Sequence, residues 1–306
     1  MGLLDTIQKR KSRLSSLSAP WTGMLPDTLI ACTDFSDASK RAFIYALEVY
    51  KPAIRKVILL NTYSIPSISI GSLVTIKDIL YQLSEEGLEQ CEDLVNSKFG
   101  RGEIEIEKIS KAGNISTVLD EIIESNPNSF LSVGTTGASG VDGVEIGSTL
   151  SAICNGTCEI PVLCVPQNAE QFKAENILYI SDLKELEVVN HLNILLGTSL
   201  LTQAEVHIAH VSERNIIQSF NVSAADRDLI PMYSELFPNV PFTYRNLNGV
   251  EPIPDQIDQI IREKKVDLIF VILSDDGFLN DIHHEKSSRT KMFSNQLPVI
   301  SLRLKD

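Results

Sequence analysis

Short, continuous apolar runs alternate with helical patterns along this chain, and the same alternation occurs twice. In the first half the apolar runs end at Cys32, Leu60, Val133 and Val165. A run that is apolar throughout is typical of a strand covered on both faces, as in a parallel sheet between layers of helices. Because each parallel strand needs a crossover to reach the next one, the alternation predicts an α/β fold.

One predicted strand differs from the others. Residues 103–107 read Glu-Ile-Glu-Ile-Glu, and strict alternation marks a strand with one wet face. Such a strand belongs at a sheet edge, which fits the strand order 3-2-1-4-5. The fold class that we expect is therefore two tandem, open, parallel five-stranded sheets of this order, with helices on both faces of each.

The second half repeats the plan of the first. Residues 177–180 precede Asp182 as residues 30–32 precede Asp34, and the closing strand at 298–302 corresponds to the one at 161–165. A length of 306 residues suits two domains of ordinary size. The predicted bounds are a leader at 1–25, a first domain at 26–167, a polar linker at 168–175 and a second domain at 176–306.

Charge and composition exclude several classes of function. The net charge is −13; residues 1–25 carry +3, residues 26–167 carry −9 and residues 168–306 carry −7. Both predicted domains are acidic, so we expect no nucleic-acid partner. No run of 18 or more apolar residues occurs, so we expect no membrane partner. Five cysteines, an odd number, without a signal peptide favour the cytoplasm.

Two smaller patterns leave alternatives open. Met1-Gly2 begins a loose myristoylation pattern followed by basic residues, so the leader is either a membrane-surface arm or a loosely docked segment. Cys154, Cys158 and Cys164 lack the spacing of a zinc pair, and we interpret them as small buried apolar residues. His283 and His284 are either solvated or part of a metal site with nearby aspartates. We predict no metal site.

The most informative stretch is the glycine-rich loop at 134–148, between the fourth strand and the fourth helix. For the order 3-2-1-4-5, ligands bind where the strand order reverses, between strands 1 and 4. There this loop meets Asp34, whose carboxylate can accept hydrogen bonds from a ribose or an adenine amine. Glycines allow close approach of backbone to ligand, and Ser148 at a helix start favours phosphate. The alternative is a plain flexible loop with Ser148 as a helix cap.

The spacing in this loop resembles the nucleotide-binding signature of the universal stress protein family. That signature is Gly, two residues, Gly, nine residues, Gly, then Ser or Thr, and residues 134–148 match it at every fixed position. Residues 33–36 and 160–166 are similar to the family's first-strand and closing-strand patterns. The resemblance covers 27–166 well and 176–304 more weakly, and it implies a fold like that of the adenine-nucleotide alpha-hydrolases.

The resemblance also implies a ligand and residue roles. The expected ligand is ATP or a related adenine nucleotide, with or without Mg²⁺, in a stress-response protein that is not an enzyme. By resemblance, Thr33 and Asp34 border the adenine and ribose, Thr62 lines the base pocket, Gly134, Thr136 and Gly137 contact ribose and phosphate, and Gly147, Ser148 and Thr149 hold the phosphates. Relatives pair through their last strands, which implies that 162–165 pairs with 299–302 within the chain. Formation of a homodimer stays open.

Departures from the family pattern keep other functions open. Ala138 stands where many relatives carry a basic residue, and the loop contains Asp142 and Glu145 but no Lys or Arg. The corresponding loop of the second half, 274–284, keeps one glycine and has three aspartates, so we predict a nucleotide site only in the first domain. The alternatives are an interaction scaffold that binds no nucleotide, and a weak ATPase. The first half has no histidine to act as a base, which argues against the ATPase.

Overall fold

The computed structural model describes residues 23–65, 70–135, 160–169, 172–181, 192–211, 231, 234–235, 239–247, 252–273 and 297–303, without the side chains of 70–75, 273 and 303. The chain divides into two compact units. The first unit holds Pro26–Phe172 together with Phe293–Arg303, and the second is built mainly from Lys173–Met292.

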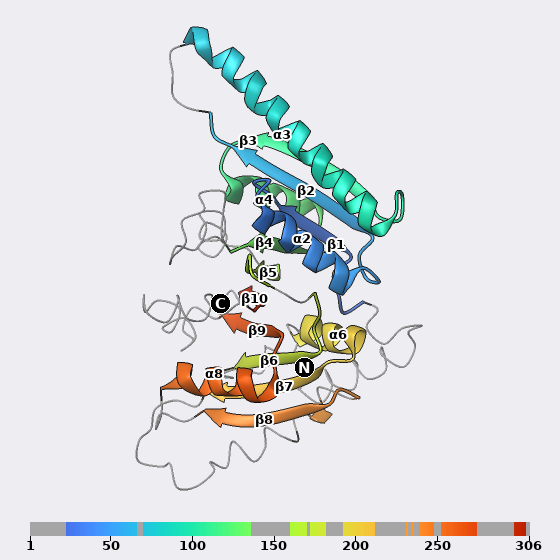
Figure 1. Ribbon diagram of the computed structural model, residues 1–306, viewed down its shortest axis with the longest axis vertical. Helices are drawn as coiled ribbons and strands as arrows, with labels where there is room; N and C mark the ends of the chain where they lie inside the picture. The colour runs from blue at the N-terminus through green and yellow to red at the C-terminus, as the bar shows by residue number, and fades with distance from the viewer. Residues whose placement is uncertain are drawn as a thin grey trace. The chain divides into compact units, whose positions relative to one another are not determined.

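The first unit contains a parallel sheet whose strands run in the order β3-β2-β1-β4-β5, as the sequence predicts. β10 then pairs antiparallel with β5, with Ile300 opposite Leu163. Figure 1 shows α2 and α3 lying along the strands of this sheet. The described elements are β1 (Thr28–Cys32), α2 (Asp37–Tyr50), β2 (Lys56–Tyr63), α3 (Ile70–Phe99), β3 (Glu105–Ala112), α4 (Ile115–Ser125), β4 (Ser129–Gly134), β5 (Val162–Val165) and β10 (Val299–Arg303).

The core of the first unit follows from the apolar runs. All five residues of β1 are buried, and α2 packs on β1, β4 and β5 while α3 packs on β2 and β3. β3 is the edge strand, as predicted, but it spans Glu105–Ala112 rather than 103–107. The alternation of polar and apolar residues stops at Glu107, whereas pairing with β2 continues to Ala112 through a half-buried stretch that includes Lys108 and Ser110.

The second unit repeats this sheet for its first four strands. Its parallel strands run in the order β8-β7-β6-β9, which is the predicted order 3-2-1-4. Leu25 from the end of the predicted leader is buried, and a Cβ added at Gly197 would lie 2.8 Å from its Cγ. The described elements are β6 (Asn176–Ser181), α6 (Leu192–Thr202), β7 (Glu205–Val211), β8 (Phe242–Leu247), α8 (Ile253–Lys264) and β9 (Leu268–Leu273).

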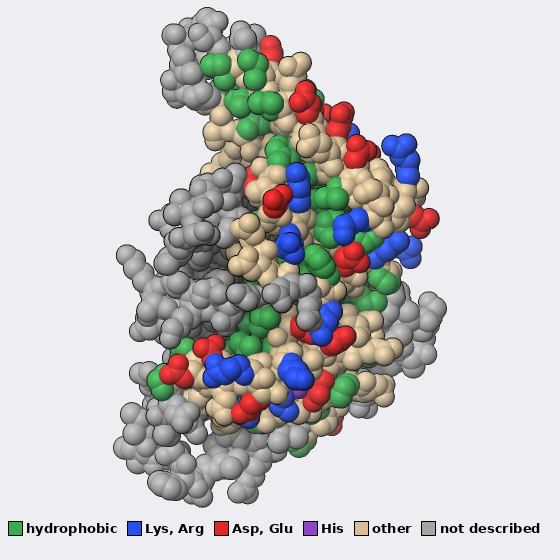
Figure 2. All heavy atoms as spheres, in the orientation of Figure 1, with side chains coloured by type: hydrophobic (Ala, Val, Ile, Leu, Met, Phe, Trp, Pro, Cys, Tyr) green, Lys and Arg blue, Asp and Glu red, His purple; other side chains and the backbone are tan. Residues whose placement is uncertain are grey.

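The surface of the first unit carries one apolar area on α3. Ile79, Tyr81 and Leu83 are exposed on this helix. In Figure 2, apolar side chains gather where α3 extends away from the sheet, beside acidic side chains further along. Among the described helices, none has the length and apolar character that crossing a membrane requires.

Candidate functional site

The predicted site lies at the carboxyl end of the sheet in the first unit. β1 pairs with β2 on one side and with β4 on the other, so the strand order reverses between β1 and β4. Thr28 is opposite Ser129 and Ala31 is opposite Ser132. Continuing this register brings Thr33 beside Gly134. The structure therefore places these two predicted site residues at the crevice where open α/β sheets bind ligands.

Thr33 organises the turn that follows β1. It is buried, and its backbone N–H extends the sheet by donating to the Leu60 carbonyl at 2.9 Å. Its hydroxyl accepts a hydrogen bond from the Phe35 N–H at 2.9 Å and shares another with the Ser39 hydroxyl at 2.9 Å. The hydroxyl is thus used within the turn, and the contribution of Thr33 to the site is to fix the backbone beside Asp34.

Asp34 is exposed and follows Thr33 directly at the carboxyl end of β1. Its Oδ1 accepts hydrogen bonds from the Ser36 N–H at 3.1 Å and from the Ser36 hydroxyl at 2.5 Å. Ser36 is the N-cap of α2, and its Oγ accepts from the Ser39 N–H at 3.2 Å. The Asp34 carboxylate is therefore held at the positive end of a helix dipole while it stays reachable from solvent.

Phe35 gives the turn an uncommon backbone conformation. Its φ is +66°, in the left-handed region that residues other than glycine rarely adopt. Its ring lies against Gly87 of α3, where an added Cβ would come within 2.6 Å of the ring carbons. Packing of the ring on α3 offsets the strain of a positive φ, so α3 helps to hold Asp34 in place.

A chain of buried polar side chains lies beneath the turn. The Asn61 amide donates to the Thr33 carbonyl at 2.7 Å, and the Ser84 hydroxyl donates to Asn61 Oδ1 at 2.8 Å. Ser110 continues the chain to Ser84 at 2.7 Å. This network joins the ends of β1, β2 and β3 to α3. Sequence reasoning missed it, although a polar Asn61 that ends the apolar run of β2 was the available signal.

Gly134 has a steric role that the sequence did not predict. A Cβ at this position would lie 2.9 Å from the Ala38 carbonyl carbon and 3.0 Å from the Ser39 nitrogen. Both are backbone atoms of the first turn of α2, which cannot move cheaply. Gly134 is therefore required for α2 to pass close to β4, whether or not a ligand also approaches it.

The remaining predicted residues are divided between the described and the undescribed parts of the chain. Thr62 is half-buried on β2, opposite Lys111 of β3. Thr136, Gly137, Gly147, Ser148 and Thr149 lie outside the described residues. The same holds for Asp182 and the loop at 274–284, so the predicted loss of the second site concerns residues that the structure does not describe.

A buried thiol lies beside Thr33. Burial raises the pKa of the Cys91 thiol on α3, whereas a hydrogen bond with the Thr33 side chain and the positive charge of Lys40 act in the opposite direction. The positive charge of Lys40, in the first turns of α2, therefore acts on the Cys91 thiol.

The described residues also bear on the metal alternatives. Within them, no group of three or more His, Cys, Asp and Glu side chains could hold a metal ion. Cys32, Cys91 and Cys164 are buried and are not in disulfides, and burial of Cys164 agrees with its interpretation as a small buried apolar residue. Cys154, Cys158, His283 and His284 lie outside the described part of the chain.

Comparison with known proteins shows what the first half of the chain resembles. The sequence model of the universal stress protein family matches residues 26–166, which include Thr33, Asp34 and Gly134. This part of the chain is therefore similar to universal stress proteins. No curated protein sequence matches the chain significantly.

Solved structures of universal stress proteins extend the likeness in fold to almost the entire chain. One from Archaeoglobus fulgidus is 18% identical with a TM-score of 0.66, and covers 92% of this chain and 98% of its own. A putative universal stress protein from Pseudomonas aeruginosa UCBPP-PA14 is 9% identical with a TM-score of 0.58, covering 92% and 94%. A functionally unknown protein from Pseudomonas aeruginosa PAO1 is 10% identical with a TM-score of 0.58, covering 92% and 93%. At these identities the likeness concerns the fold.

Proposed function

We propose that residues 26–166 bind an adenine nucleotide, ATP or a close relative, and that the protein is a nucleotide-dependent regulator in a stress response rather than an enzyme. The observation that carries the proposal is the position of Asp34. Its exposed carboxylate is fixed at the start of α2, beside Gly134, at the point where the strand order reverses. The glycine spacing of the family signature begins at the same point.

The described residues suit such a ligand. A carboxylate at this edge can accept hydrogen bonds from the hydroxyls of a ribose, and the buried Asn61 network keeps its turn from shifting. When bound, the nucleotide would place its phosphates against Gly137, Gly147, Ser148 and Thr149, with or without Mg²⁺, and would stabilise the conformation that encloses it.

The proposal does not include turnover. Hydrolysis or transfer of a phosphoryl group needs a positioned base or nucleophile, and the first half of the chain has no histidine. Asp34 is already engaged by Ser36 at the helix cap, which suits binding better than proton transfer. We expect ATP hydrolysis no faster than in a preparation of the Asp34→Ala variant. Pairing of the two domains through their last strands, and assembly into a homodimer, stay predictions.

Thermal unfolding in the presence of MgATP tests the proposal. A ligand at about 100 times its dissociation constant stabilises the folded state by about 2.7 kcal/mol. We expect MgATP to raise the unfolding temperature of the wild-type chain and MgGTP to do so less. Gly137→Val should abolish the MgATP shift, because a branched side chain would occupy the path of the ligand and disfavour a positive φ.

A matched control separates binding from folding. Asp34→Asn removes the charge at the proposed site, and Asp182→Asn makes the same change at the corresponding position of the second half. We expect the first to reduce the shift and the second to leave it intact. A wild-type chain without any shift would instead favour the interaction scaffold, and hydrolysis that disappears in Asp34→Ala would favour the weak ATPase.

A further inference from the structure

The segment that follows β5 is fixed to the helix that begins at the candidate site. Arg41 of α2 donates a hydrogen bond from Nη1 to the Ala169 carbonyl at 2.9 Å, and its guanidinium lies 5.8 Å from the centre of the Phe172 ring. The Tyr45 ring lies 5.9 Å from the same ring. Ala169 is almost fully buried. Ala169 and Phe172 of the predicted polar linker are therefore held by α2 of the first unit.

The same helix carries the site and the linker contact. Arg41 follows the cap residue Ser36 by five positions, about 7.5 Å along a helix axis, and Tyr45 follows one turn later on the same face. Because a packed helix moves as a rigid body, a displacement of its capped end is transmitted to Arg41. A ligand that contacts the Asp34 turn therefore acts on the element that binds the linker.

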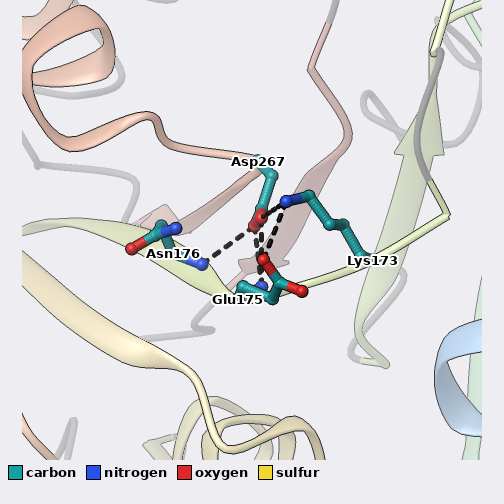
Figure 3. A network of polar contacts seen from close by, with 4 residues as sticks. All are labelled: Lys173, Glu175, Asn176 and Asp267. Atoms are coloured by element: carbon teal, nitrogen blue, oxygen red, sulfur yellow. Dashed lines mark hydrogen bonds and ion pairs between the residues drawn. The ribbon is translucent and has the colours of Figure 1, made fainter.

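The other end of the linker is fixed as well (Figure 3). The buried Asp267 carboxylate accepts hydrogen bonds from the Glu175 N–H at 3.0 Å and from the Asn176 N–H at 3.1 Å. Lys173 lies 3.7 Å from it and donates to Glu175 at 2.8 Å. Asp267 immediately precedes β9, and Asn176 begins β6. The linker thus ends in a polar clamp at the base of the second sheet.

From these contacts we propose that the α2–linker contact made by Arg41, Tyr45 and Phe172 reports occupancy of the first-unit site: nucleotide binding tightens the hold of α2 on Ala169 and Phe172. The inference rests on the proposed function and adds its means of regulation. Since coupling between two sites is reciprocal, a weaker linker contact must also weaken nucleotide binding. The linker, rather than a catalytic product, would carry the bound state of the protein to its second unit.

Hydrogen exchange of the full chain, together with calorimetry using MgATP, tests this proposal. In the wild type, MgATP should slow exchange in the peptide covering 166–175. Arg41→Met keeps an unbranched apolar stem but removes the guanidinium with its donor and charge. It should speed exchange at Ala169 about tenfold without ligand and remove the response to MgATP. We expect roughly fivefold weaker MgATP binding by this variant, near the lower end of typical coupling. Arg41→Lys should restore part of both effects.

Lys51, at the other end of α2, provides a matched control. It donates to the Phe99 carbonyl at 3.2 Å and lies 5.7 Å from the centre of the Phe99 ring, so it makes the same two kinds of contact without touching the linker. Lys51→Met should leave MgATP binding and linker exchange as in the wild type. Phe172→Ala changes the linker itself and should show the same faster linker exchange and weaker MgATP binding as Arg41→Met. It replaces Arg41→Met in the test if that variant folds poorly.

The outcomes distinguish this inference from the proposed function. MgATP binding that leaves exchange of the linker unchanged in the wild type would overturn the inference alone. So would Arg41→Met and Phe172→Ala variants that bind MgATP as tightly as the wild type. A wild-type chain that binds no MgATP would overturn the proposed function, and the inference with it.

Discussion

The contact between Phe35 and Gly87 predicts that Gly87→Ala lowers the free energy of unfolding, although this type of substitution usually raises it. Gly87 lies inside α3, and replacing glycine by alanine in a helix interior ordinarily stabilises a protein by about 0.8–1.0 kcal/mol. Here the added Cβ would lie 2.6 Å from two carbons of the Phe35 ring. That is about 1 Å closer than a favourable carbon–carbon contact. Steric crowding of this kind typically costs ~1–3 kcal/mol.

The two effects oppose each other, and the structure decides which is larger. The ring cannot swing away freely, because Phe35 is fixed by a φ of +66° and by the hydrogen bond from its N–H to Thr33. We therefore expect Gly87→Ala to destabilise the first unit by about 1 kcal/mol. With Phe35→Ala already present, the Cβ meets no ring, and the same substitution should stabilise by about 1 kcal/mol.

Urea unfolding of the four proteins of this cycle, followed by circular dichroism, measures the coupling. The predicted interaction free energy is roughly 2 kcal/mol, within the range found for residues in contact. Glu86→Ala, an exposed change on the same helix, should shift the midpoint little. If Gly87→Ala stabilised the wild-type chain as much as it stabilises the Phe35→Ala variant, the ring would not lie on α3, and the account of how Asp34 is held would be wrong.

Three further predictions concern the buried polar groups. Burial lowers the pKa of His207. Its contribution to stability is therefore present above the unfolded-state pKa of about 6.5 and is lost as the pH falls below that value. His207→Gln should flatten the dependence of the unfolding free energy on pH between about 5 and 7, and an unchanged slope would contradict this. Asp267→Asn removes the charged acceptor of the Glu175 and Asn176 N–H groups and should cost the second unit ~1–3 kcal/mol in urea unfolding, whereas a neutral effect would show that the clamp adds nothing. Asn61→Ala leaves the Thr33 carbonyl and the Ser84 hydroxyl without their partner and should cost the first unit ~1–3 kcal/mol; a loss below about 0.5 kcal/mol in the same assay would mean that water replaces the amide.

The sequence predicted the sheets well because their strands are apolar on both faces. β1 and β2 each contain a continuous apolar run, at 29–32 and 57–60, and burial of both faces leaves few other ways to place such a run. The edge strand was located but its bounds were not, since the half-buried residues that follow Glu107 in β3 no longer alternate between apolar and polar. The order of the strands and the position of the edge strand could thus be predicted from the pattern, whereas the end of the edge strand could not.

The candidate site was predicted in part, for a different physical reason. Asp34 and Gly134 were predicted from ligand chemistry and from the family signature, and the structure brings the ends of the strands that precede them side by side; their contact with a ligand stays a prediction. The left-handed φ of Phe35 could not be read, because that conformation is expected of glycine or asparagine and depends here on the distant Gly87. The steric need for Gly134 depends likewise on where α2 passes.

The contacts of the linker also could not be predicted from the residues next to it in the sequence. Residues 168–175 are polar overall and were predicted to be a plain connection between domains. The structure buries Ala169 and Ala174 and binds both ends of the segment, through Arg41 and Asp267. These partners lie 128 and 92 positions away along the chain from the residues that they bind, so no local pattern could have predicted the contacts.

Calorimetric titration of the full chain with MgATP tests whether the chain binds one nucleotide in its first unit. We predict a single class of site with a stoichiometry near one nucleotide per chain, because the signature occurs once, at 134–148. Asp34→Ala should weaken this binding, and Asp182→Ala should leave both the affinity and the stoichiometry unchanged. A stoichiometry of two, or a titration of Asp34→Ala that matches the wild type, would contradict the claim that the nucleotide binds at the β1–β4 crevice of the first unit.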